Sequence, residues 1–234
     1  MVYLVGTAHF SSKSQEDVLK TITSVQPDVV AVELCESRML ILSMDEEKAL
    51  EESRNMDFKK ILHYMKDVGT IQGIIQVAMI SLSAHITRKL GMAPGGEFRA
   101  AYAACKTVPA CRFVLCDRPI QITLNRAVAS LSIFQKMRLF VQLLRSSRAD
   151  ITAEEVEKAK EGDVLDKMLK EMSEQFPTLA KTLIEERDLF IILIFVFFSV
   201  KWQKVVVVAV LGMGHIPGIV ANWEKDINIR PLYE

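Results

Sequence analysis

Two Gly-x-x-His segments stand far apart in the chain, and each presents a histidine just behind an apolar run: Gly6-Thr7-Ala8-His9 and Gly212-Met213-Gly214-His215. A carboxylate, Glu33, closes a third apolar run. Two neutral imidazoles and one carboxylate are a usual ligand set for a divalent metal that keeps a position open for water. Such a metal lowers the pKa of its bound water and polarises a carbonyl group. The residue types therefore predict a divalent metal, such as Mn, Co or Zn, held by His9, Glu33 and His215.

Four apolar segments are expected to be the strands that position these side chains: Val2 to Val5, Val29 to Leu34, Arg112 to Cys116 and Val205 to Leu211. A helical apolar stripe between the first two indicates a β-α-β unit with parallel strands. Runs without alternation, such as the last one, are typical of strands buried on both faces. Ligands bind beyond the carboxyl ends of parallel strands. The sequence therefore predicts an α/β fold with a mainly parallel sheet and a site at the carboxyl ends of its strands.

Further charged side chains follow the same strand ends. Asp117 and Arg118 come directly after the third predicted strand, and Arg38 follows the second. We predict that Glu33 ligates the metal or takes a proton from its water, and that Arg38 or Arg118 stabilises a developing oxyanion. Asp117 completes the predicted catalytic set. The alternative for Glu33 is a structural ion pair with Arg38.

Two long helical insertions separate the predicted strands, at about 45–110 and 119–200, within a single domain that spans 1–234. In the second insertion, Ile133 to Leu144 combine an apolar face with Lys and Arg side chains. Such a helix lies on a membrane, binds a partner, or is a core helix with a solvated basic edge. We expect the core helix. The histidines His63 and His85 stand on helical segments without a motif, and we expect them to be core residues.

The stretch Leu189 to Val200 reads LFIILIFVFFSV. It is too short for a membrane-spanning helix, which needs about 20 residues, and too uniformly apolar for a surface helix. We expect it to be buried or to lie at an interface. The substitution Ile194→Glu distinguishes the two, because a charge in a buried helix unfolds the domain, whereas a charge in an interfacial helix only removes membrane binding.

The composition excludes some classes of function. Lys plus Arg and Asp plus Glu number 29 each, so no net charge recruits nucleic acid, and we expect no nucleic-acid partner. The four cysteines form no Cys-x-x-Cys pair and are expected to be reduced thiols, which favours a cytoplasmic location. The chain opens directly in a predicted strand, so we expect no signal peptide and a domain taken from a longer protein.

The segments that carry these residues also resemble a known family. VYLVGTAHFS, VVAVELCESR, PGGEFRAA, LCDRPIQITLNRA and VLGMGHIPGI together resemble the TraB/PrgY/GumN family from the first strand to about Trp223. This family resembles the Tiki metalloproteases, in which two Gly-x-x-His motifs and a glutamate are taken as the metal site. Carried over, those residues are His9, His215 and Glu33. The resemblance also implies a fold similar to that of ChaN-like haem-binding proteins and erythromycin esterases (ChaN/EreA-like).

One segment departs from the family pattern. After an Arg-Asp pair like Arg187-Asp188, the family usually continues as an amphipathic helix and a polar connector, where this chain has Leu189 to Val200. The run is therefore part of the core, an anchor, or an aberrant coding segment.

Two functions are expected from the residues and the resemblance together. The first is a metal-dependent hydrolase that acts on peptide or ester bonds, with a peptide or a small molecule as substrate. The second is a non-catalytic regulator or tether at the mitochondrial outer membrane or at membrane contact sites, because eukaryotic members of the family are associated with them. A peripheral membrane surface or a membrane protein would then be the partner. The Gly-x-x-His motifs favour the first function, and the basic helix and the apolar run favour the second.

Overall fold

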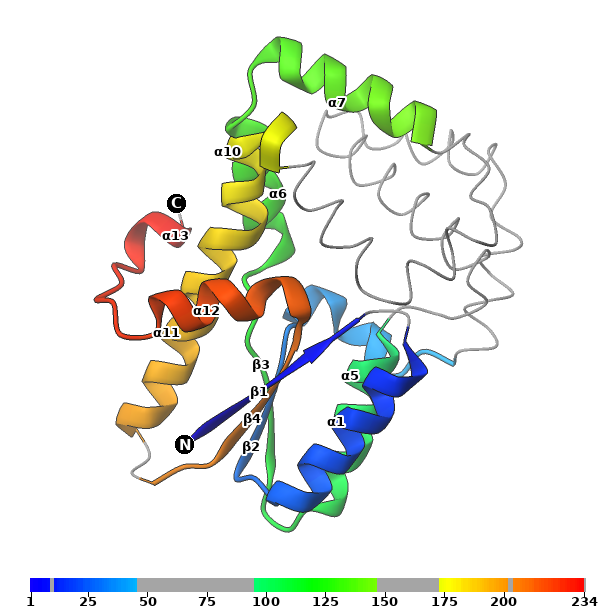
Figure 1. The fold of residues 1–234 in the computed structure, drawn as a ribbon, viewed down its shortest axis with the longest axis vertical. Helices are drawn as coiled ribbons and strands as arrows, with labels where there is room; N and C mark the ends of the chain where they lie inside the picture. Colours follow the sequence, from blue (N-terminus) through cyan, green and yellow to red (C-terminus); the bar gives the residue numbers. More distant parts are fainter. Residues whose placement is uncertain (9–10, 46–94, 147–172, 202–203, 234) are drawn as a thin grey trace.

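The computed structural model describes residues 1–8, 11–45, 95–146, 173–201 and 204–233, and its centre is one parallel sheet (Figure 1). The strands lie in the order β1-β4-β2-β3, with β1 at Val2–Thr7, β2 at Val29–Val32, β3 at Arg112–Leu115 and β4 at Val207–Gly212. All three neighbouring pairs are parallel. The predicted α/β fold with a parallel sheet is confirmed, whereas the closer likeness to ChaN-like proteins stays a prediction.

Helices cover both faces of this sheet (Figure 1). The helical elements are α1 Ser12–Val25, the 3₁₀ turn η1 Glu36–Leu42, α5 Gly96–Thr107, α6 Ile120–Ala129, α7 Ile133–Ser146, α10 Pro177–Ala180, the π segment η2 Lys181–Glu185, α11 Glu186–Lys201, the 3₁₀ turn η3 Met213–His215, α12 Ile216–Asn222 and α13 Arg230–Tyr233. The predicted helical stretch between the third and fourth strands is present. Of the first insertion, 46–94 lies outside the described residues, and His63 and His85 lie there with it.

The two central strands are buried on both faces, which explains why their sequences do not alternate. Their side chains divide between two cores. Toward α1 and α5 point Val30, Val32, Val208 and Val210. Toward α11 point Val29, Ala31, Val207, Ala209 and Leu211. Burying one such valine or leucine stabilises the fold by about 1.5 to 3 kcal/mol, so β2 and β4 hold the two helical layers together.

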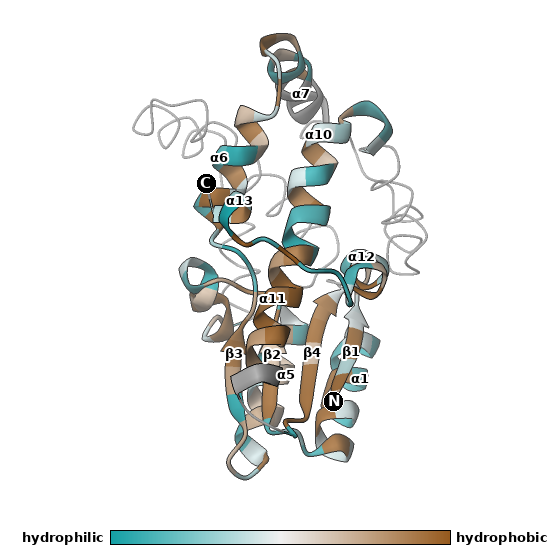
Figure 2. Cartoon of the chain, turned by 90° about the vertical axis from the view of Figure 1, so that its left-hand side faces the viewer, coloured by the Kyte–Doolittle hydropathy of each residue, from teal (hydrophilic) through white to brown (hydrophobic). Residues whose placement is uncertain are grey.

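The apolar run Leu189 to Val200 forms most of α11, which lies along the sheet as a continuous hydrophobic helix (Figure 2). Ile191, Ile192 and Phe195 are at most 1% exposed and belong to the core on that face of the sheet. The run is therefore a core helix, which was one of the two predicted alternatives. In the part of the chain that the structure describes, no helix is both long and apolar enough to cross a membrane.

Helix α7 differs from its prediction. We expected its apolar face from Ile133 to Leu144 to be in the core, but Ile133, Phe134, Met137 and Val141 are exposed, whereas the side chains of Phe140 and Leu144 lie outside those described. The physical reason is its position, because α7 follows the end of α6 and lies far from the sheet (Figure 1). Its apolar face therefore has no sheet to pack on.

Candidate functional site

The carboxyl ends of β2, β3 and β4 bring together side chains that are far apart in sequence. Glu33 follows β2, Asp117 follows β3, and His215 ends the turn that follows β4. Arg38 enters from η1, and two residues enter from the first turn of α11. We call the resulting group the charged cluster, and its members are Glu33, Arg38, Asp117, Arg187, Asp188 and His215.

Glu33 is buried, and both of its carboxylate oxygens are engaged. Oε2 accepts a hydrogen bond of 2.7 Å from the backbone nitrogen of Gly212, which ties Glu33 to the end of β4. Oε1 pairs with Nη2 of Arg187 and lies 3.0 Å from Nε2 of His215. Arg38 reaches only the backbone oxygen of Glu33, at 3.5 Å. The alternative of an ion pair between Glu33 and Arg38 is therefore not what the structure has, because Arg187 pairs with that carboxylate.

Asp117 joins the two arginines of the cluster. Its Oδ1 accepts from Nε of Arg187 at 2.8 Å, and its Oδ2 accepts from Nη2 of Arg187 at 3.0 Å. The same Oδ2 accepts from Nη2 of Arg38 at 2.6 Å. The Arg38 side chain is 39% exposed, although its Nε is itself buried and has no hydrogen-bond partner among the described residues. Arg38 is therefore more exposed to solvent than Arg187, whose side chain is 15% exposed.

His215 is held between two carboxylates. Its Nδ1 lies 2.6 Å from Oδ1 of Asp188, and its Nε2 lies 3.0 Å from Oε1 of Glu33. Gly218, in α12, leaves room for the Asp188 carboxylate that contacts Nδ1 of His215, because a Cβ at this position would lie 1.9 Å from Oδ2 of Asp188. Only glycine leaves that space. The imidazole ring is thus fixed from both sides.

The surroundings also set the charge of these groups. Burial alone would lower the pKa of His215, but its hydrogen bonds to Asp188 and Glu33 outweigh burial and raise this pKa to about 9. Burial would raise the pKa of Glu33, but Arg187 and His215 hold it well below its usual range. Burial raises the pKa of Asp188 in spite of the hydrogen bond with His215. At neutral pH His215 is therefore an imidazolium, and its Nε2 lies 3.1 Å from Nη1 of Arg187, so two cations lie side by side because both bind Oε1 of Glu33.

Arg118 points away from the charged cluster, although Asp117 precedes it. It is fully buried. Its guanidinium donates to the hydroxyl of Thr123 at 3.0 Å, to Glu186 at 2.7 Å, and to the carbonyl oxygens of Thr182 and Leu232 at 2.9 and 3.3 Å. These partners come from α6, α11, η2 and α13, so Arg118 links these four helical segments through hydrogen bonds.

Arg187 and Asp188 were not placed in the site by the sequence. They begin α11 directly after the π segment η2, and π turns are rare and occur often at functional sites. In this turn the carbonyl oxygen of Leu183 accepts from Nη1 of Arg187 at 3.1 Å. A signal was present, because four charged residues, 185–188, stand immediately before an apolar run. When the apolar part of a helix is buried, charged residues at its first turn are also drawn toward the interior. They then need partners of opposite charge at that end of the helix.

The donor atoms of His215 and Glu33 suit a divalent ion in two respects. Nε2 and Oε1 face each other at 3.0 Å, and Asp188 holds the other ring nitrogen, as a carboxylate usually does for metal-ligating histidines. Arg187 binds the same oxygen of Glu33 and must release it before an ion binds. No three His, Cys, Asp or Glu groups of the described residues are placed to hold one ion. The third predicted ligand, His9, lies outside those residues.

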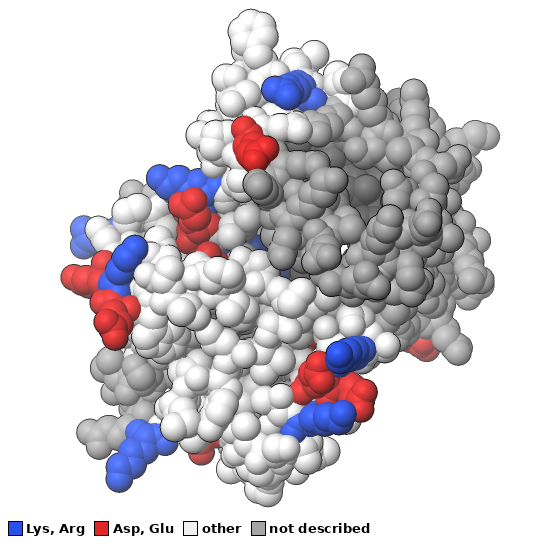
Figure 3. Space-filling model, viewed as in Figure 1, with Lys and Arg blue, Asp and Glu red and all other residues white. Residues whose placement is uncertain are grey.

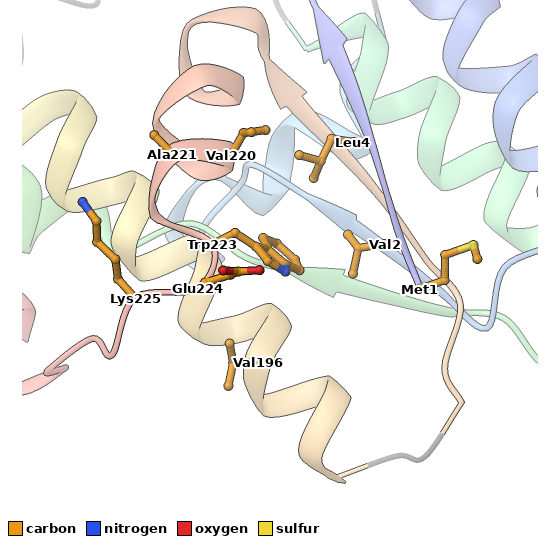
Figure 4. Close-up of a pocket in the computed structure, with 9 residues that line it drawn as sticks. All are labelled: Met1, Val2, Leu4, Val196, Val220, Ala221, Trp223, Glu224 and Lys225. Atoms are coloured by element: carbon orange, nitrogen blue, oxygen red, sulfur yellow. The ribbon is translucent and has the colours of Figure 1, made fainter.

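A separate apolar hollow opens between β1, α11 and α12 (Figure 4). It encloses about 690 Å³, and its apolar lining includes Val2, Leu4, Val196, Val220 and Trp223. Lys225 points away from the indole ring of Trp223 (Figure 4). None of the residues that line this hollow belongs to the charged cluster, so the two are distinct features.

The charged cluster lies beyond the carboxyl ends of the parallel strands, which is where ligands bind in open α/β sheets. The chain belongs to the TraB/PrgY/gumN family, whose sequence model matches residues 1–226.

Relatives from distant organisms match almost the whole chain. The TraB domain-containing protein of Homo sapiens is 43% identical over 244 residues, and an uncharacterized protein of Methanocaldococcus jannaschii is 34% identical over 241 residues. Each match covers 99% of this chain, but 65% of the human protein and 56% of the archaeal protein. This chain therefore spans a little under two thirds of the human relative and just over half of the archaeal one.

Proposed function

We propose that this chain is a metal-dependent hydrolase of a peptide or ester bond, in which His9, Glu33 and His215 hold a divalent ion. The observation that supports the proposal is the pair of facing donor atoms, Oε1 of Glu33 and Nε2 of His215, with Asp188 behind the ring. When bound, Mn, Co or Zn would supply a water of lowered pKa and polarise the substrate carbonyl.

The residues around the pair have separate roles in this proposal. Asp188 holds the proton on Nδ1 of His215, so that Nε2 is the nitrogen that loses its proton when the site is loaded. Glu33 stays a carboxylate because its pKa is held low, and it either ligates or takes a proton from the water. Asp117 binds two nitrogens of Arg187 and therefore anchors this arginine when it releases Glu33.

Arg38 is the residue that we propose to contact the substrate. Asp117 fixes its guanidinium at 2.6 Å, and the Arg38 side chain is 39% exposed to solvent. A donor held in place before the reaction stabilises a developing oxyanion at little reorganisation cost. Arg118, the other predicted candidate, is left out because its guanidinium already donates to several buried acceptors.

Metal analysis of the purified chain tests the proposal. We expect uptake of Mn, Co or Zn after chelation and reloading, and its loss in Glu33→Gln and His215→Ala. Asp28→Asn is the matched control, because Asp28 also accepts a backbone N–H, that of Val206 at 2.8 Å, at the opposite end of the sheet. Hydrolysis of a panel of peptide and ester substrates should follow the metal content. Wild-type protein that takes up none of the three metals would overturn the proposal.

A second candidate function is a non-catalytic tether or regulator at the mitochondrial outer membrane or at membrane contact sites. The observation that favours it is the outward-facing apolar side of α7. Fractionation of cells that produce wild-type protein or Glu33→Gln tests it. A tether remains with the mitochondrial fraction in both cases, whereas protein found only in the soluble fraction contradicts this function.

A further inference from the structure

The outer face of α7 is a surface that the charged cluster does not use. The helix begins at a capping box, in which the nitrogen of Ser132 donates to Oε1 of Gln135 at 2.8 Å and the nitrogen of Gln135 donates to Oγ of Ser132 at 3.3 Å. Large apolar side chains then face outward, with exposed fractions of 62% for Ile133, 83% for Phe134, 59% for Met137 and 41% for Val141.

These four side chains form a stripe with a cation on each side. At about 100° per residue they fall within a face about 100° wide, and Lys136 and Arg138 lie about 40 to 60° beyond its two edges. Residues 133–146 contain three Lys or Arg residues and no Asp or Glu. Over α7, the surface at the top of the molecule is white with one blue patch, and a red patch lies just below the blue one (Figure 3). The stripe itself is apolar, and the sequence of α7 places Lys136 beside it.

The helix is held to the body of the protein on one flank. The guanidinium of Arg138 lies 5.6 Å from the ring centroid of Phe176, which is buried. Leu131, just before α7, is buried with Phe176 in a small separate core. These contacts fix the base of α7 and leave the stripe pointing away from the protein.

An anionic lipid surface matches this pattern. Amphipathic helices that lie in a membrane interface bury their apolar face at the boundary of headgroups and acyl chains, and their Lys and Arg side chains reach the lipid phosphates. At 14 residues α7 is about 21 Å long and cannot cross a hydrocarbon core of about 30 Å, so it lies along the surface.

We propose that α7 docks this protein on an anionic lipid surface, with Ile133, Phe134 and Met137 at the acyl boundary and Lys136 at the phosphates. The proposal rests on the second candidate function, for which it names the contacting helix and the lipid partner, and it does not depend on hydrolysis, because none of the residues of the charged cluster comes from α7. Loss of metal binding in Glu33→Gln would therefore leave it untouched.

Sedimentation of the full chain with vesicles tests this proposal. We expect binding to vesicles of phosphatidylserine and phosphatidylcholine to be at least about fivefold stronger than to phosphatidylcholine alone, since a cation such as Lys136 near the surface is worth about fivefold. Phe134→Glu should weaken binding to the anionic vesicles by about tenfold or more, because a large buried ring is replaced by a negative charge. Leu40→Glu is the matched control, because Leu40 is 80% exposed on η1 and its change adds the same charge.

A second variant removes charge alone. Lys136→Gln should weaken binding to anionic vesicles by about fivefold and leave binding to neutral vesicles unchanged. It also keeps the test valid if Phe134→Glu does not fold, which a thermal melt shows. Equal binding to the two kinds of vesicle would overturn the proposal. So would a wild-type chain that ignores vesicles but self-associates through Phe134 in light scattering, since the stripe would then be an interface between copies.

Discussion

The first turn of α11 and the turns that follow it make opposite contributions to the free energy of folding. Arg187 and Asp188 in the first turn are charged and buried in the cluster, which is costly unless every charge is paired. Ile191, Ile192 and Phe195 come next and are buried against the sheet, which is favourable. The apolar part therefore holds the charged part in place. A functional group on a rigid, well-packed element keeps its geometry better than one on a loop.

The charged cluster pairs its own charges. Three carboxylates face three cations, and each carboxylate contacts at least one cation within hydrogen-bond distance. Removing one member leaves another with an uncompensated charge. In the apolar half of α11, removing one contact leaves only a cavity. The two halves should therefore respond differently to substitution, and the following changes measure that difference.

The largest effect is expected in the apolar half. Ile191→Glu places a carboxylate in the apolar core between α11 and the sheet and should destabilise the fold by about 5 kcal/mol or more, comparable to the whole stability of a domain. Phe197→Glu, on the same helix but 55% exposed, should cost about 1 kcal/mol or less. Circular dichroism and urea titration measure both. Ile191 is a sharper choice than Ile194, which is only partly buried. Equal stability of the two variants would contradict the packing of α11 on the sheet.

The next effect is expected in the charged half. Arg187→Met leaves Glu33 and Asp117 without their main cation and should cost about 3 to 5 kcal/mol. Arg38→Met is the matched control, since Arg38 also binds Asp117 but is 39% exposed and should cost about 1 kcal/mol or less. Urea titration at neutral pH gives both values. Matched losses in the two variants would show that Arg187 is not the central cation.

The sequence was sufficient for the strands and for the residues at their ends. An apolar run followed by a polar residue locates the carboxyl end of a parallel strand, so Glu33, Asp117 and His215 were predicted to converge, and they do. Partner choice was not predictable, because Arg38, Arg118 and Arg187 differ only in where the fold directs each guanidinium. His9 lies outside the described residues, so its convergence with this group stays a prediction.

Two further differences have physical reasons. The Gly-x-x-His pattern does not reveal what Gly212 does, because among the described residues Gly95 is the only glycine with positive φ and Gly212 needs no left-handed backbone. The backbone nitrogen of Gly212 instead donates to Glu33. Whether the apolar face of α7 meets the core depends on where α6 ends in space. Helical periodicity predicts the face but not that position.

The third prediction concerns the pH dependence of stability in the metal-free protein. The pKa of His215 rises from 6.5 to about 9 on folding, so its protonated form contributes stability that is complete below about pH 6.5 and is lost as the pH rises toward 9. A shift of this size corresponds to about 3 kcal/mol. Urea titrations in the presence of a chelator, across this pH range, measure the loss. His215→Gln should remove most of the slope, and an unchanged slope would show that another group titrates.

The smallest effect on stability is expected for Asp188→Asn. Asp188 lies in the charged first turn of α11, directly before the apolar turns. Asparagine keeps an oxygen for Nδ1 of His215 but no negative charge, so unfolding should become easier by only about 1 kcal/mol. If Asp188 positions a metal-ligating histidine, metal affinity should nevertheless fall by about 10- to 100-fold, as for other carboxylates behind such histidines. Metal titration and urea titration of the same samples separate the two effects, with Asp28→Asn as the control. A loss of stability with unchanged metal affinity would mean that the first turn of α11 is structural, like the apolar turns behind it.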